Sequence, residues 1–278
     1  MLLYPYTEKV DKAAESEDII PVKLSMERKR MQFHSYGDKK NKTILALHGM
    51  LCDWQKFREL LKPLEETYYV IYPAMTGCYD GSENFVSFAK ESEQIEAYVT
   101  ENLGGELYAV WGASQGATVL TELLARNRIS IEKAILDGVY LAHQGKICAK
   151  LGLKAFLKMQ KNGGQISKRM QVVSKLMGLG KEDLAEFSLL YWGSSKECMQ
   201  ANLIENYTYR VNEDISKTET KVYLWCGSKE PYAIKSHEIL KKYLKNYEEH
   251  IWPNVGHGVM LYFHTDEYVD AVREKLKE

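Results

Sequence analysis

A serine framed by two glycines is the residue of this chain best suited to covalent chemistry. Glu106–Arg126 has the pattern of a short apolar strand, a turn and an amphipathic helix. The turn, Gly112-Ala113-Ser114-Gln115-Gly116, matches G-x-S-x-G, a pattern that places the serine hydroxyl outward on a sharp strand-to-helix corner. A side chain at position 112 or 116 would crowd that corner, so glycine is expected at both. The backbone amide of Gln115, at the positive end of the helix, is then free to bind an oxyanion.

A serine hydroxyl is a poor nucleophile at neutral pH and needs a base to accept its proton. We expect His257 to be that base, because glycines frame it in Gly256-His257-Gly258 and because imidazole titrates near neutrality. His48 precedes the loop expected to bind the oxyanion, and we expect it to shape that loop. Packing or surface roles are expected for the other histidines: His34, His143, His237, His250 and His264.

Two carboxylates are candidates for the acid that orients His257. Such an acid holds the imidazole in one tautomer and stabilises its protonated form. Glu230 lies in the turn after the apolar run Lys221–Cys226 and is the first choice. Asp137, at the end of the apolar run Ile131–Leu136, is the alternative.

The elements that must position these residues alternate between strand and helix. Compact apolar runs predict strands buried on both faces, and Asp53 is expected to begin a helix. Short connections between alternating strands and helices require a largely parallel sheet with helices on both faces. We expect an α/β fold with about eight strands, whose carboxyl ends face one crevice. The expected strands include an antiparallel hairpin of Val22–Met26 and Met31–Tyr36, followed by Thr43–Leu47, Tyr68–Tyr72, the strand before Ser114, Ile131–Leu136, Lys221–Cys226 and Glu249–Trp252.

Residues 141–219 break this alternation and have the pattern of four helices without a strand. We expect a helical subdomain, inserted after strand six into a discontinuous core made of residues 1–140 and 220–278. The first helix carries lysines on one line, which we interpret as a solvated face. A dock for anionic lipid or an acidic partner is the alternative, which the near-neutral net charge disfavours. These lysines are Lys146, Lys150, Lys154 and Lys158.

The composition is ordinary for a soluble globular protein and excludes several classes of function. The 278 residues are 45% hydrophobic and 27% charged, with a net charge of −1, so nothing points to nucleic acid. No apolar run is long enough to cross a membrane, and the first residues lack the pattern of a signal peptide. The five cysteines show no paired motif, which indicates reduced thiols in a cytoplasmic protein. No metal-ligand spacing, phosphate-binding loop or dinucleotide motif is present, so no metal or cofactor is expected.

These features together resemble the α/β-hydrolase fold superfamily with a helical cap. The resemblance rests on His48-Gly49 after a strand, the turn at Ser114, an acid after the next-to-last strand and the glycine-framed His257 after the last. The chain order of serine, acid and histidine is that of the superfamily. The resemblance implies that Ser114, Glu230 and His257 are catalytic and that the amides of Met50 and Gln115 form the oxyanion hole. Glutamate in place of the more frequent aspartate is a departure, and so is Pro73 near the usual position of another aspartate.

The expected function is a serine hydrolase that cleaves a small or medium carboxylic ester through an acyl-enzyme. The expected partner is a small-molecule ester, with no nucleic acid and no integral membrane contact, and homodimer formation is left open. A triad-dependent lyase or carbon–carbon bond hydrolase, and a non-catalytic ligand-binding protein with the same fold, are the alternatives. The residues expected to line the substrate pocket are Met50, Leu51, Tyr140, Phe187, Tyr191 and Trp192.

Overall fold

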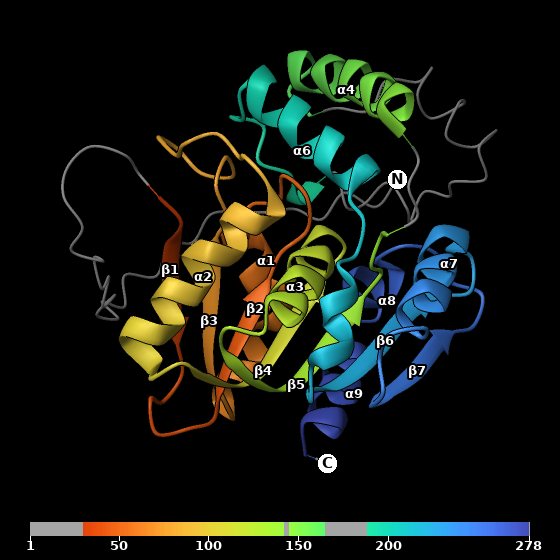
Figure 1. The fold of residues 1–278 in the computed structure, drawn as a ribbon. Coiled ribbons are helices and arrows are strands. Elements are labelled where there is room, and N and C mark those ends of the chain that lie inside the picture. Colours follow the sequence, from red (N-terminus) through yellow and green to blue (C-terminus); the bar gives the residue numbers. More distant parts are fainter. Residues whose placement is uncertain (1–29, 142–144, 165–187, 278) are drawn as a thin grey trace.

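A seven-stranded sheet forms the centre of the computed structural model, which describes residues 30–141, 145–164 and 188–277 (Figure 1). The strand order is β1-β3-β2-β4-β5-β6-β7, and only β1 runs antiparallel to its neighbour. The strands are β1 (Gln32–Tyr36), β2 (Thr43–Leu47), β3 (Tyr69–Ala74), β4 (Glu106–Ala113), β5 (Ser130–Asp137), β6 (Lys221–Gly227) and β7 (Tyr247–Trp252).

The mostly parallel α/β sheet is confirmed, but the strand count is one lower than expected in the described residues. The expected partner of β1 in the hairpin, Val22–Met26, lies outside the described residues. Within the described residues, β1 pairs with β3. The helical insertion therefore follows the fifth described strand, β5.

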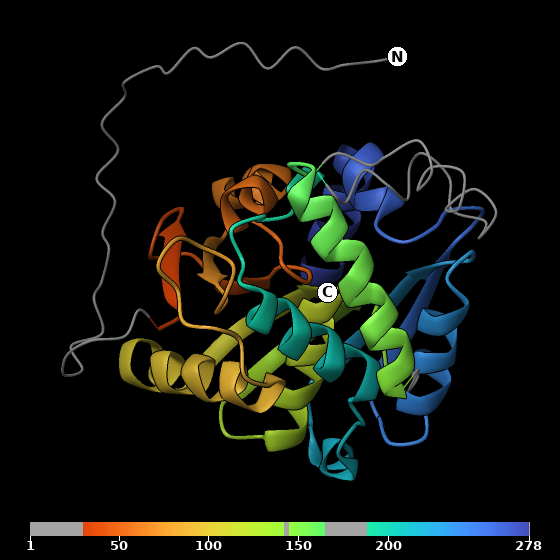
Figure 2. The same ribbon diagram turned by 90° about the horizontal axis from the view of Figure 1, so that it is seen from above.

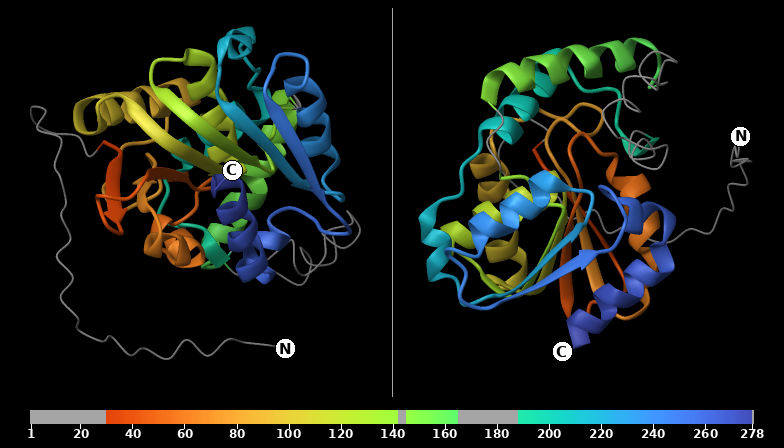
Figure 3. Two further views of the ribbon diagram at one scale, coloured as in Figure 1. Left: turned by 90° about the horizontal axis from the view of Figure 1, so that it is seen from below. Right: turned by 90° about the vertical axis from the view of Figure 1, so that its right-hand side faces the viewer.

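Helices cover both faces of the sheet, as the alternating pattern required (Figure 3). Leu45 and Leu47 of β2 belong to the core cluster under α2, α3 and α7, whereas Ile44 and Ala46 belong to the cluster under α1 and α9. This alternation explains why the strand is a continuous apolar run, since both of its faces are buried. The helices are α1 (Trp54–Leu61), α2 (Phe88–Leu103), α3 (Gln115–Arg126), α7 (Pro231–Leu240), α8 (Val259–Phe263) and α9 (Thr265–Lys277), with short 3₁₀ turns η1 (Lys62–Glu66) and η3 (Glu213–Lys217).

Two further helices, α4 (Gly145–Lys161) and α6 (Lys196–Thr208), lie above the carboxyl ends of the strands (Figures 1 and 2). We refer to them as the cap helices. They pack on each other. The N-cap of α6 is Ser195, whose side chain accepts a hydrogen bond from the amide of Cys198 at 3.0 Å. The rest of the expected cap, residues 165–187, lies outside the described residues. No helix in the described part of the chain combines the length and the apolar character needed to cross a bilayer.

Candidate active site

Ser114 lies on a strained turn between β4 and α3. Its backbone angles, φ 54° and ψ −115°, fall outside the helical and extended regions, and its amide donates to the carbonyl of Asp137 at 2.7 Å. A Cβ added at Gly112 would lie 2.5 Å from the carbonyl oxygen of Gly116, and one at Gly116 would lie 2.2 Å from that of Leu47. The close approach of the two backbones therefore requires glycine at both positions, as the sequence predicted. Such strain persists only where the surrounding structure enforces it, and it is concentrated at functional sites.

His257 and Glu230 form a close pair of titratable side chains at this end of the sheet. Nδ1 of His257 lies 2.5 Å from Oε2 of Glu230, and Oε1 of Glu230 accepts from the amide of Gly227, also at 2.5 Å. Glu230 is 4% exposed, whereas 22% of the His257 side chain is exposed. The buried carboxylate therefore holds the imidazole through Nδ1, so that Nε2 is the nitrogen that would act as the base.

Asp137, the alternative acid, has a different hydrogen-bond partner. The hydroxyl of Tyr268 donates to its Oδ2 at 2.7 Å, and the indole N–H of Trp111 donates to that hydroxyl at 2.9 Å. Burial and the nearby charge of Glu230 raise the pKa of Asp137 to about 7, against the opposing effects of Tyr268 and His257. Glu230 is therefore the carboxylate that contacts His257. Asp137 is bound to Tyr268 and is the less favoured candidate for the acid.

Gly138 is a site residue that the sequence analysis missed. A Cβ at this position would lie 2.6 Å from Cε1 of His257 and 2.9 Å from its Nδ1. Its φ of +60° also favours glycine. Because the amide of Ser114 binds the carbonyl of Asp137, the dipeptide Asp137-Gly138 contacts the serine turn on one side and the histidine on the other. A glycine directly after a buried strand was the only signal in the sequence.

His48 holds the loop after β2 in place, in agreement with the expectation. It is fully buried, its Nδ1 lies 2.8 Å from the carbonyl oxygen of Gly49, and its Nε2 accepts from the amide of Met75 at 3.2 Å. Burial lowers the pKa of His48 to about 4, so the ring stays neutral at physiological pH with its proton on Nδ1. The loop that carries Met50 is thus tied to the loop after β3.

Comparisons with known proteins agree with this geometry at the level of the fold. No family model and no curated protein matches the chain. Among solved structures, an α/β hydrolase family protein from Desulfitobacterium hafniense has a TM-score of 0.75 at 22% identity, and the match covers 88% of this chain and 100% of that one. A thermophilic esterase from Thermogutta terrifontis has a TM-score of 0.69 at 14% identity, and the match covers 89% of this chain and 93% of that one. This chain has the α/β-hydrolase fold. A meta-cleavage product hydrolase from Pseudomonas fluorescens is also similar, with a TM-score of 0.62 at 16% identity. This match covers 88% of this chain and 93% of that one.

On this α/β-hydrolase fold, the loop that carries the expected oxyanion donor is clamped by the chain that precedes α6. The amide of Tyr191 donates to the carbonyl of Leu51, and that of Asp53 donates to the carbonyl of Leu189, both at 2.7 Å. Between them, Cys52 and Leu190 form an isolated antiparallel bridge. No pattern in the sequence indicates this pairing, because the partners are separated by more than a hundred residues and the bridge is one residue long.

The structure brings together some of the expected pocket residues but not all of them. Leu51, only 1% exposed, lies in an apolar cluster with Met50 and Trp192, so it forms part of the cap packing rather than an open pocket wall. Tyr140 presents its ring edge-on to His257, with centroids 5.4 Å apart. The Tyr191 hydroxyl instead donates to Asp80. Phe187 lies outside the described residues.

The side chain of Gln115 links the serine turn to the cap, a contact that the sequence did not predict. It is 3% exposed; its Nε2 donates to Oδ1 of Asn202 at 2.8 Å, and its Oε1 accepts from Nδ2 of Asn206 at 3.2 Å. Both asparagines lie on α6. The residue expected to supply an oxyanion amide is therefore also held to a cap helix through its side chain.

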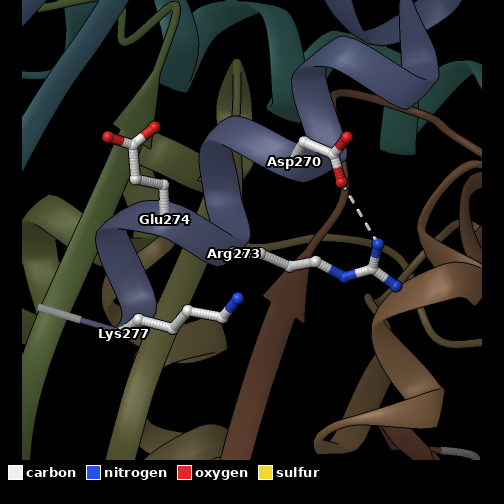
Figure 4. Close-up of a pocket in the computed structure, with 4 residues that line it drawn as sticks. All are labelled: Asp270, Arg273, Glu274 and Lys277. Atoms are coloured by element: carbon white, nitrogen blue, oxygen red, sulfur yellow. Dashed lines mark hydrogen bonds and ion pairs between the residues drawn. The ribbon is translucent and has the colours of Figure 1, made fainter.

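A hollow of about 550 Å³ on α9 is separate from these residues (Figure 4). Four charged side chains of this one helix line it, and two of them, Asp270 and Arg273, form an ion pair at 3.3 Å. None of the residues expected to be catalytic lines it. Within the described ranges, no group of three or more His, Cys, Asp or Glu side chains is arranged to hold a metal ion.

Proposed function

We propose that this protein is a serine hydrolase that cleaves a small or medium carboxylic ester. The observation that carries the proposal is the buried Glu230 carboxylate, 2.5 Å from Nδ1 of His257, at the end of the sheet where Ser114 occupies its strained turn. The esterase from Thermogutta terrifontis shares the fold, which supports the proposal without fixing the substrate.

In the proposed reaction, Oγ of Ser114 attacks the ester carbonyl carbon while Nε2 of His257 takes its proton. The negative charge on the carbonyl oxygen is stabilised by the amides of Met50 and Gln115, and each such donor contributes about 3 kcal/mol. His257 then gives its proton to the leaving alkoxide, and an acyl-enzyme remains on Ser114. Water, activated by the same imidazole, releases the acid. Throughout, Glu230 stabilises the imidazolium form of His257.

The apolar residues near the loop after β2 suggest where the acyl group would bind. Met50 and Trp192 are partly exposed beside Phe156 of α4, and Tyr140 borders His257. An apolar wall with few polar groups is suited to an acyl chain rather than to a charged substrate.

A second candidate reaction is hydrolysis of a carbon–carbon bond. It is favoured by the similarity to a meta-cleavage product hydrolase, because a single fold can support more than one hydrolytic reaction.

Initial rates with a panel of p-nitrophenyl esters and with a vinylogous diketone would test both candidates. We expect saturable ester hydrolysis, lowered by at least about 10³-fold in kcat/KM by Ser114→Ala. Ser130→Ala, at an exposed serine where β5 begins, is the matched control and should keep the wild-type rate. Turnover of the diketone alone would favour the carbon–carbon reaction, and full ester activity in Ser114→Ala would contradict both candidates.

A further inference from the structure

The outer face of α4 is both basic and apolar. The helix carries five lysines, Lys146, Lys150, Lys154, Lys158 and Lys161, and no acidic residue. All five are exposed. Among them, Ile147 and Leu151 stand one turn apart with 77% and 61% of their surface exposed. A purely solvated face has no reason to carry two large apolar side chains in this position.

The opposite face of α4 already provides the packing that the helix needs. Ala149 and Met159 are buried, and Leu153 and Phe156 pack against the cluster that contains Leu51 and Met199. In the described part of the chain, Ile147 and Leu151 belong to none of the core clusters. They are therefore available to a partner outside the molecule.

Other exposed apolar residues gather at the same end of the molecule. Of the seven large hydrophobic residues that are exposed in the described ranges, five lie in segments that follow the carboxyl ends of strands, and the other two lie on the edge strand β7. Figures 1 and 2 show α4 as the outermost described element at this end. The five are Val86, Ile147, Leu151, Tyr232 and Phe263.

The positive charge of α4 indicates that its binding partner is anionic. The whole chain has a net charge of −1, so the five positive charges of α4 are a local concentration rather than a general excess. Near an anionic membrane, each lysine contributes about 1 kcal/mol, and a lysine-rich face with apolar residues is typical of helices that lie in the membrane interface. We infer that α4 docks this protein on an anionic phospholipid surface, with Ile147 and Leu151 inserted between the headgroups.

This inference replaces the expectation that the lysines form only a solvated face, because the exposed pair Ile147 and Leu151 is unexplained by that interpretation. Docking through α4 would turn the cap end of the molecule toward the lipid. It goes beyond the proposed function, since it concerns where the protein binds and not which bond it breaks.

Flotation of the 278-residue chain with lipid vesicles tests the inference. One set of vesicles contains phosphatidylcholine alone, and in the other phosphatidylserine replaces part of it. We expect the wild type to float with the anionic vesicles and to be released by salt. Replacing four lysines of α4 by glutamine should weaken binding by at least about 10²-fold. The four are Lys146, Lys150, Lys154 and Lys158.

The matched control removes the same charge from the opposite end of the sheet. The control lysines are exposed and lie before β2, before β7 and at the end of α9, and their replacement by glutamine should leave vesicle binding unchanged. A third variant, Ile147→Ser with Leu151→Ser, should weaken binding by about tenfold without any change of charge. The control lysines are Lys39, Lys40, Lys242 and Lys277.

Equal loss of binding in the α4 and control sets, or no flotation of the wild type with anionic vesicles, would overturn the inference. Binding to soluble polyglutamate without binding to vesicles would also overturn it and would assign the helix to an acidic protein partner. Hydrolysis of a water-soluble ester by the same preparations should be unaffected by the α4 variants. Failure of the docking inference is thereby distinguished from failure of the proposed function.

Discussion

The carboxylate of Glu230 lies 2.5 Å from Nδ1 of His257, and at the scale of single residues this contact fixes the tautomer of the imidazole. An amide in its place would present an N–H to Nδ1 and favour the wrong tautomer. We predict that Glu230→Gln lowers kcat by about 10³–10⁴-fold, as loss of a triad carboxylate does elsewhere. Steady-state kinetics on the best ester of the panel would measure this loss.

Asp137→Asn is the control for that prediction, because an asparagine oxygen can still accept from Tyr268. We expect its kcat to stay within about tenfold of the wild type, since the hydrogen bond is retained. A larger loss in Asp137→Asn than in Glu230→Gln would transfer the role of the acid to Asp137.

Gly138 offers a second test at the same scale, because an added methyl group would collide with the imidazole of His257. We predict that Gly138→Ala lowers kcat/KM by at least about 10²-fold through displacement of that ring. The positive φ adds a stability loss of about 1–2 kcal/mol. Gly104→Ala is matched in backbone strain, with a φ of +69°, but a Cβ there meets nothing within 4 Å. Gly104→Ala should therefore lose stability and keep its activity; equal activity in the two variants would refute the role of Gly138.

The site residues that could be predicted from the sequence are those whose expected roles leave a local pattern. Ser114 is marked by its flanking glycines and His257 by its glycine-framed loop, because tight turns impose residue types on the chain itself. Tyr268 and the side-chain role of Gln115 left no pattern. Tyr268 meets Asp137 across 131 positions, and Gln115 meets Asn202 across 87, so only the folded chain reveals these partners.

At the scale of elements, Glu91 ties helix α2 to the loop after β3. Its carboxylate is 1% exposed and accepts from the amide of Thr76 at 3.1 Å and from the Thr76 hydroxyl. Burial raises the pKa of Glu91 to about 7, although the Thr76 hydrogen bonds oppose this shift. In the unfolded chain, the pKa of Glu91 has its ordinary value of 4.5. Between pH 4.5 and about 7, the folded state therefore keeps a proton on Glu91 that the unfolded chain has released.

This difference predicts how stability depends on pH. Glu91 contributes fully to the free energy of unfolding at low pH, where it is protonated in both states. This contribution is lost as the pH rises from about 4.5 through about 7, because burial makes ionisation of Glu91 unfavourable in the folded state. Relative to Glu91→Gln, the free energy of unfolding of the wild type should fall by up to about 3 kcal/mol across that range. Urea titrations at the two ends of the range would measure it. Glu274→Gln, at an exposed position on α9, should show a constant difference from the wild type, and a constant difference in Glu91→Gln would contradict the prediction.

The bounds of a helix or strand could be predicted where residues at its ends have a recognisable pattern. Asp53 begins α1 as expected, its side chain accepting from the amide of Gln55 at 2.9 Å. The last strand was predicted too short, because β7 lies at the edge of the sheet and its first residues, Tyr247 and Glu248, lack an apolar pattern. The clamp of Tyr191 on Leu51 could not be predicted, since it consists of backbone hydrogen bonds that impose no residue type.

At the scale of the whole molecule, the sheet gathers residues that are far apart in the chain. Ser114 follows β4, Glu230 follows β6 and His257 follows β7, and all three lie at the carboxyl ends of parallel strands. Between them, β5 ends in Asp137-Gly138, which contacts both the serine turn and the histidine. The order of the sheet, rather than any single loop, therefore assembles the candidate site. The alternation of strands and helices predicted a largely parallel sheet whose carboxyl ends face one crevice, but it did not predict the order of the strands.

The central claim is that this assembly makes Ser114 an activated nucleophile, and labelling with a fluorophosphonate tests it most directly. Intact mass after treatment should show one adduct on the folded wild type. It should show none on Ser114→Ala or on wild type unfolded in denaturant, because an isolated serine hydroxyl is unreactive. An unlabelled wild type, or an adduct that persists in Ser114→Ala, would contradict the account.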